Sequence, residues 1–109
     1  MISFWAAIAR NDCPSILRFL IGGSDPDEPS PKSGEPPLII AARLGRAEAL
    51  SMLLEGGAGT EGRDRQGRTA LHCAARRGDA AMAGALLTDW GAHAMPRDRY
   101  GDTPVHVAA

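Results

Sequence analysis

The apolar residues of this chain fall into short clusters with helical spacing, and each cluster ends at glycine or at another turn-forming residue. In the clearest case Leu50, Leu53 and Leu54 follow an i, i+3, i+4 pattern, and Gly56 and Gly57 come directly after them. This spacing places the three leucines on one face of a helix, which the glycines terminate. Comparable patterns predict further helices over residues 4–10, 12–21, 36–44, 70–77 and 79–87.

A sequence of turn, helix and stop over residues 64–78 recurs along the chain. Similar segments occur 34 residues later and 33 residues earlier. Asp64 and Gly67 suit a tight turn, Thr69 suits the cap of a helix, and Gly78 suits a left-handed helix end. Asn11 stands where the later units have glycine, and asparagine tolerates the same left-handed conformation. The period divides the chain into a degenerate first unit (1–30), a second (31–63), a third (64–97) and a truncated fourth (98–109).

The repeat predicts an all-α fold in which the units support one another. One helix pair cannot bury its apolar face alone, whereas stacked pairs bury a continuous layer. The chain has three pairs and a fourth unit that stops at Ala109, inside its first helix. We therefore expect either that the natural protein continues, or that a partner or a second copy of the chain covers the open end.

Two stretches carry a family resemblance. Residues 67–79 and 102–109 are similar to the Thr-Pro-Leu-His-x-Ala-Ala signature of the ankyrin repeat, whose period is about 33 residues. Residues 53–58 are similar to the Leu-Leu-x-x-Gly-Ala that follows in that family. Ile39 in place of the signature His and Pro31 in place of the turn Asp are departures. The resemblance implies an ankyrin-type solenoid of stacked antiparallel helix pairs joined by β-hairpin-like turns.

Composition and charge narrow the function classes. The net charge of −1 gives no general reason to expect nucleic-acid or membrane binding. There is no apolar run of the roughly 20 residues that a bilayer span requires, and the first residues do not resemble a signal peptide. Cys13 and Cys73 occur in different local contexts, and nothing suggests that they pair. We therefore expect an intracellular protein, cytoplasmic or nuclear.

The residues that could suggest a catalytic or metal site are better interpreted as structural residues. The resemblance implies that His72 and His106 each hydrogen-bond near the Thr of their own signature. Cys73 lies among alanines and is interpreted as a small buried side chain, and Asp64 and Asp98 are expected to hold their own turns. The sequence has no Cys-x-x-Cys, His-x-x-x-His or phosphate-loop motif. It predicts no catalytic residue, no cofactor, no metal site and no small-molecule substrate.

The distribution of arginines is more informative about function than the histidines, cysteines and aspartates. In an ankyrin-like stack the turn tips and the outer ends of the first helices line a concave groove, and arginine binds carboxylates bidentately. Tyr100 is expected to anchor the same surface, since tyrosine and arginine are enriched in interface hot spots. A solvated surface of mixed charge is the alternative. The residues expected in the groove are Arg43, Arg65, Arg68, Arg76, Arg77, Arg99 and Tyr100.

The predicted function is protein–protein recognition through the turn tips and the concave face, with a partner that carries an acidic segment. A rigid, preformed surface would keep the ordering cost of binding low. One alternative is an architectural or self-associating segment of a longer protein. Nucleic-acid binding is a weaker alternative, because stacking aromatics are absent. Trp5 is expected to cover the first helix pair, whereas Trp90 suits either a contact at the opposite edge or packing over a loop.

Overall fold

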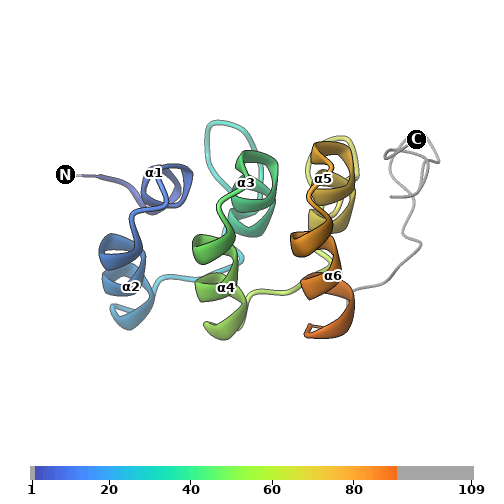
Figure 1. The fold of residues 1–109 in the computed structure, drawn as a ribbon. Coiled ribbons are helices and arrows are strands. Elements are labelled where there is room, and N and C mark those ends of the chain that lie inside the picture. The colour runs from blue at the N-terminus through green and yellow to red at the C-terminus, as the bar shows by residue number, and fades with distance from the viewer. Residues whose placement is uncertain (1, 91–109) are drawn as a thin grey trace.

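The structure, a computed structural model of the chain, describes residues 2–90; residues 1 and 91–109 lie outside the described part. Within residues 2–90 the secondary structure is entirely helical, as the all-α prediction required. The six helices form three consecutive pairs (Figure 1). They are α1 (Phe4–Ala9), α2 (Cys13–Ile21), α3 (Pro37–Leu44), α4 (Ala47–Glu55), α5 (Ala70–Arg77) and α6 (Ala80–Thr88).

The three pairs stack side by side as two layers. The first helices of the pairs, α1, α3 and α5, form one row, and α2, α4 and α6 form the row beneath it (Figure 1). Helix α3 contacts both α1 and α5, and α2 contacts α4. The pairs fall within the first three expected units, whose boundaries stay a prediction, and the fourth unit lies outside the described residues.

The helices begin where the sequence places capping side chains. The hydroxyl of Ser3 accepts a hydrogen bond from the Ala6 backbone N–H at 3.2 Å, and Oδ1 of Asp79 accepts one from Met82 at 3.0 Å. Thr69 forms a capping box with His72 at the start of α5. Helices α3 and α4 have no side-chain cap of their own at their first residues.

The helix ends confirm the expected left-handed residues. Gly45 and Gly78, which follow α3 and α5, have φ angles of 72° and 76°. Asn11 takes the same role after α1, with a φ of 55°, and it is the only non-glycine residue with positive φ among residues 2–90. The chain can therefore reverse sharply between the helices of each pair.

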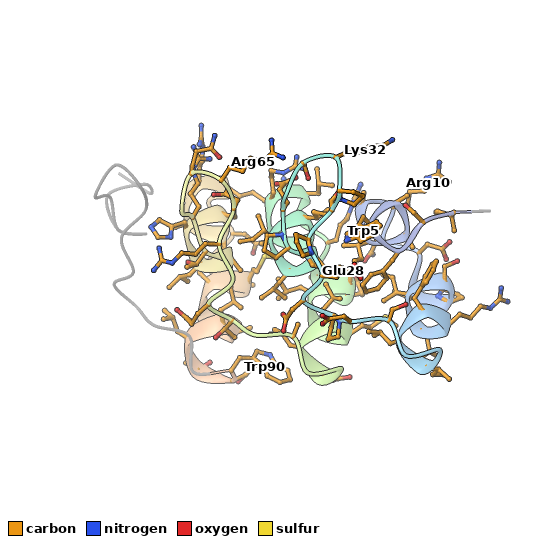
Figure 2. All side chains as sticks on the ribbon, turned by 180° about the vertical axis from the view of Figure 1, so that it is seen from behind. Trp5, Arg10, Glu28, Lys32, Arg65 and Trp90 are labelled. Atoms are coloured by element: carbon orange, nitrogen blue, oxygen red, sulfur yellow. The ribbon has the colours of Figure 1, made fainter. Side chains whose placement is uncertain are left out.

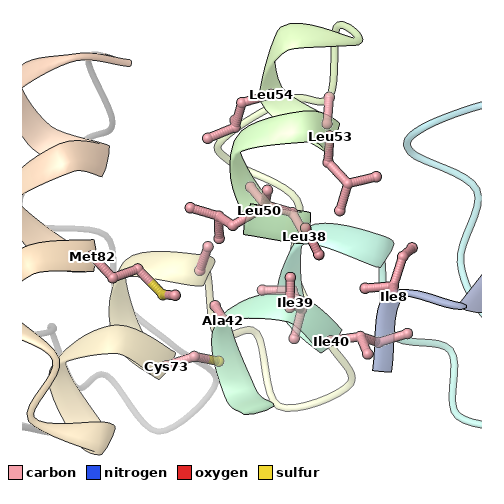
Figure 3. Close-up of a cluster of buried hydrophobic side chains, with 14 of the residues drawn as sticks. Ile8, Leu38, Ile39, Ile40, Ala42, Leu50, Leu53, Leu54, Cys73 and Met82 are labelled. Carbon is pink, nitrogen blue, oxygen red and sulfur yellow. The ribbon is translucent and has the colours of Figure 1, made fainter. Parts of the chain in front are cut away.

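The core lies between the two layers and between neighbouring pairs (Figure 3). Ile8, Ile39 and Leu53 are completely buried, and they come from three different helices. Ala41 and Ala74 are also completely buried, and their small size lets the first helices approach closely. Leu71 is 4% exposed, so it belongs to this core as expected.

The turns close by backbone hydrogen bonds and project beyond the first helices. Oδ1 of Asp64 accepts bonds from the N–H groups of Gln66 and Arg68, both at 2.9 Å, so Asp64 holds its own turn as predicted. In the preceding turn, which contains Pro31, the N–H of Ser30 bonds to the carbonyl of Glu35 at 2.8 Å. The proline-rich connection therefore forms a closed turn although it lacks the Asp.

Candidate protein-binding groove

An arginine-rich depression lies between α3 and α5, beside the turn that precedes α5. We call it the arginine hollow; its volume is about 450 Å³. Asp64 and Cys73 contribute to its wall beside the basic side chains. The carboxylate of Asp64 is engaged by the backbone of its turn, so arginine dominates the chemistry of the hollow. The arginines that line it are Arg43, Arg68, Arg76 and Arg77.

The repeat places these arginines at related positions. Arg43 and Arg76 both lie two residues before the glycine that ends their helix, so stacking brings them to adjacent places on the same face. Arg77 follows Arg76 in the last turn of α5, where the helix dipole favours a positive charge. Arg68 lies directly before the cap of α5 and reaches the hollow from the turn side.

Arg43 differs from the other arginines because it is already paired. Its Nε and Nη2 donate to the two carboxylate oxygens of Glu35 at 2.7 Å and 3.0 Å. These hydrogen bonds raise the pKa of Arg43, and the Glu35 charge acts in the same direction. Within residues 2–90, by contrast, the side chains of Arg68, Arg76 and Arg77 form no hydrogen bond or ion pair.

Two arginines cross to the preceding repeat. Arg77 lies directly against Gly45, and a side chain at Gly45 would meet its guanidinium. Arg65 lies over Gly34 in the same manner, at the tip of its turn beside that of Lys32 (Figure 2). Arg65 does not line the arginine hollow. Of the predicted groove residues, four therefore share one hollow and Arg65 lies outside it against Gly34, whereas Arg99 and Tyr100 are outside the described residues.

His72 and Cys73 have structural surroundings, as expected. His72 is completely buried, and its Nδ1 lies 3.1 Å from the Thr69 backbone nitrogen and 3.0 Å from the Thr69 hydroxyl. Cys73 is 7% exposed, and burial raises the pKa of its thiol to about 11. The thiol therefore stays protonated at neutral pH and contributes apolar surface to the lining of the hollow. His106 and Asp98 lie outside the described residues.

A second depression, which was not predicted from the sequence, adjoins Arg43 on the side of the first repeat. We call it the Trp5 hollow; it lies between α1, α3 and the Pro31 turn and has a volume of about 460 Å³. Trp5, Ala9 and Ile40 supply apolar surface, and Arg43 lines both hollows. Trp5 was expected to cover the first helix pair; its side chain is half-buried and also lines this hollow.

The position of Trp5 is determined by a contact distant in the sequence. Its indole Nε1 donates to the carbonyl oxygen of Glu28 at 2.8 Å, and its ring lies 6.4 Å from that of Phe4 (Figure 2). Trp90 follows α6 in the other layer and is 37% exposed, so both of its expected roles stay predictions.

A periodic signal for the second hollow is present in the sequence. Five residues before each helix-ending residue stand Ala6, Ile40 and Cys73, and two residues before it stand Ala9, Arg43 and Arg76. All six line one or the other hollow. The later of the two positions thus changes from a small apolar side chain at the first repeat to a basic side chain at the third.

In the described part of the chain no helix is long and apolar enough to cross a membrane.

Comparison with known proteins identifies the family. A family model described as ankyrin repeats, in three copies, matches residues 4–98. Because the match covers most of the 109 residues, this chain belongs to the ankyrin-repeat family. Ankyrin repeats are in general modules for protein–protein interaction.

The curated relatives are much longer proteins. The chain is 32% identical to inversin from Gallus gallus over 74 residues, which is 68% of this chain and 7% of inversin. It is 44% identical to neurogenic locus notch homolog protein 4 from Homo sapiens over 63 residues, 57% of this chain and 3% of that protein. For SH3 and multiple ankyrin repeat domains protein 2 from Homo sapiens the identity is 44% over 62 residues, 56% and 3%. The chain thus spans less than a tenth of each relative.

Proposed function

We propose that this chain is a protein-interaction module that binds an acidic segment of a partner protein in the arginine hollow. The supporting observation is that four arginines line one concave depression, and that three of them form no ion pair within residues 2–90. Planar guanidinium groups with unused donors suit carboxylates, which they can bind through two parallel hydrogen bonds. The rigid helices that carry them keep the ordering cost of binding low.

The first experiment measures binding of a fluorescently labelled hexaglutamate peptide by anisotropy. The double variant Arg68→Glu with Arg76→Glu should weaken binding at least about tenfold, because it removes two donors and introduces two repelling charges. The affinity of the unchanged protein should also fall as salt is added, since the arginines are solvent-accessible. Urea unfolding should show that the double variant keeps its stability, because neither arginine has a partner to lose in the described structure.

The matched control is Arg10→Glu with Arg18→Glu. It changes the net charge by the same amount, but both arginines are exposed and line neither the arginine hollow nor the Trp5 hollow. Equal losses of hexaglutamate affinity in the two double variants would show that only overall charge matters. Unchanged affinity in the Arg68→Glu, Arg76→Glu variant would refute the proposal. Binding of a single-stranded oligonucleotide as tightly as hexaglutamate would favour the nucleic-acid alternative instead.

The architectural alternative predicts self-association. Sedimentation velocity at increasing protein concentration would show a growing sedimentation coefficient if copies stack end to end.

A cytoplasmic or nuclear setting is part of the proposal, because Cys13 and Cys73 are both free thiols.

A further inference from the structure

The Trp5 hollow and the arginine hollow share the lining residue Arg43 but differ in chemistry. In the Trp5 hollow, Trp5, Ala6, Ala9 and Ile40 supply apolar surface, and Lys32 and Glu35 line it as well. In the arginine hollow the arginines predominate. A ligand that spans both hollows therefore meets a largely apolar subsite and a basic subsite in succession.

We infer that the partner segment carries a bulky apolar side chain in the Trp5 hollow, next to the carboxylates in the arginine hollow. This inference rests on the proposed function, and it names the partner's chemistry more fully. The basic subsite selects carboxylates by charge. Because Arg43 lines both hollows, the adjoining residues of the same segment can reach Trp5 and Ile40. Removing a leucine or aromatic side chain from water there adds affinity that charge alone does not supply.

The stacking distance sets the spacing in the segment. The two hollows lie between consecutive pairs of first helices, so they are one repeat apart. Packed helices are about 10 Å apart. An extended chain advances about 3.3 Å per residue. The apolar side chain should therefore precede or follow the carboxylates by about three residues.

The divide between the subsites is the ion pair of Arg43 with Glu35. The Glu35 side chain is 15% exposed, while the Arg43 side chain is 51% exposed. Arg43 lines both hollows with its charge compensated by Glu35, and Lys32 is the other basic side chain that lines the Trp5 hollow. This arrangement separates the apolar subsite from the uncommitted donors of Arg68 and Arg76.

The test compares synthetic peptides on the full chain. LSGEEE and EEEGSL place a leucine three residues from the nearest glutamate, in either chain direction. SSGEEE and EEEGSS lack the leucine, and LSGQQQ lacks the charges. At least one leucine peptide should bind about tenfold more tightly than its serine counterpart, and LSGQQQ should bind weakly.

A resonance readout locates the leucine. The indole N–H signal of Trp5 in a ¹⁵N–¹H correlation spectrum, assigned with the variant Trp90→Phe, should move with a leucine peptide and stay in place with SSGEEE. Ala9→Gln should abolish the leucine advantage without weakening SSGEEE, because the longer side chain fills the hollow. Ala47→Gln is the matched control, because Ala47 is exposed at the start of α4.

The outcomes separate the two proposals. If SSGEEE binds through Arg68 and Arg76 but the leucine peptides bind no more tightly, the apolar subsite is refuted and the acidic-partner proposal stands. If none of the glutamate peptides binds, the acidic-partner proposal fails and the subsite inference fails with it. Tight binding of LSGQQQ would contradict the basic subsite while leaving a leucine site at Trp5.

Discussion

Asn11 shows how one residue can serve both its own turn and the neighbouring repeat. Its backbone occupies the left-handed region that ends α1. Its side-chain Oδ1 accepts a hydrogen bond from the N–H of Ala49 at 3.1 Å, and its Nδ2 donates to Oε2 of Glu48 at 2.9 Å. Helix α4 begins after Arg46 without a side-chain cap of its own. Asn11 therefore caps the second repeat from the first, because a helix N-terminus leaves N–H groups unsatisfied.

Substitution of Asn11 separates these two roles. Asn11→Gly keeps the left-handed turn and removes the cap, so it should cost about 1 kcal/mol of unfolding free energy. Asn11→Ala loses the cap and also strains the backbone, and it should cost about 2–3 kcal/mol. Urea titration followed by circular dichroism measures both values. Equal costs for Gly and Ala would show that the left-handed conformation contributes little.

The ion pair of Glu35 with Arg43 gives a prediction about binding at the level of single side chains. Glu35 accepts hydrogen bonds from Nε and Nη2 of Arg43, the edge of the guanidinium that an incoming carboxylate would also use. Glu35→Gln should therefore raise the affinity for hexaglutamate about two- to fivefold. Stability should change by less than about 1 kcal/mol, because the pair is partly exposed to solvent.

Glu55→Gln is the control for this change. Glu55 is exposed at the end of α4, in the opposite layer, and the charge difference is the same. An equal rise in affinity for both variants would mean that the protein's net charge, and not the release of Arg43, controls binding.

At the scale of elements, hydrogen bonds between the first and second repeats fix how the helix pairs stack. Nε of Arg46 donates to the carbonyl oxygen of Ala9 at 2.8 Å, and Oδ1 of Asp27 accepts from the N–H of Gly59 at 2.9 Å. Together with the Asn11 cap they join α1 and the loop after α2 to α4 and its flanking residues. They keep α1 beside α3, and this contact forms the Trp5 hollow.

Most helix starts and ends could be predicted from nearby residues, whereas the cap of α4 could not. The starts at Ser3, Thr69 and Asp79 and the ends at Gly45 and Gly78 were expected, because caps and left-handed stops act within one turn of helix. The cap of α4 was not predictable from its own residues, since its donor-binding oxygen comes from 38 positions earlier.

At the scale of the whole molecule, stability is shared among neighbouring repeats. Leu71→Ala should lower the unfolding free energy by roughly 2–5 kcal/mol, from lost burial and the cavity left behind. Trp5 and Trp90 lie in the first and third repeats, so tryptophan fluorescence reports on both ends of the described stack. If the stack is cooperative, fluorescence and circular dichroism should give the same urea midpoint.

The control for Leu71 is Leu87→Ala. Leu87 is 38% exposed on α6, so its truncation should cost clearly less than that of Leu71, which is 4% exposed. A change below about 1 kcal/mol at Leu71 would contradict its place in the core. Separate midpoints for fluorescence and circular dichroism would show instead that the repeats unfold independently.

The sequence by itself determined the repeat, its helices, most of their caps and stops, and the arginines at related positions of successive repeats. These features depend on side-chain chemistry within a few residues and on periodicity, which a linear chain displays directly. Only the tertiary structure decided that Asn11 caps α4, that Glu35 pairs with Arg43, and that Trp5 lines the Trp5 hollow. Such contacts depend on the separation and rotation of stacked helix pairs, and these follow from the packing of the whole core.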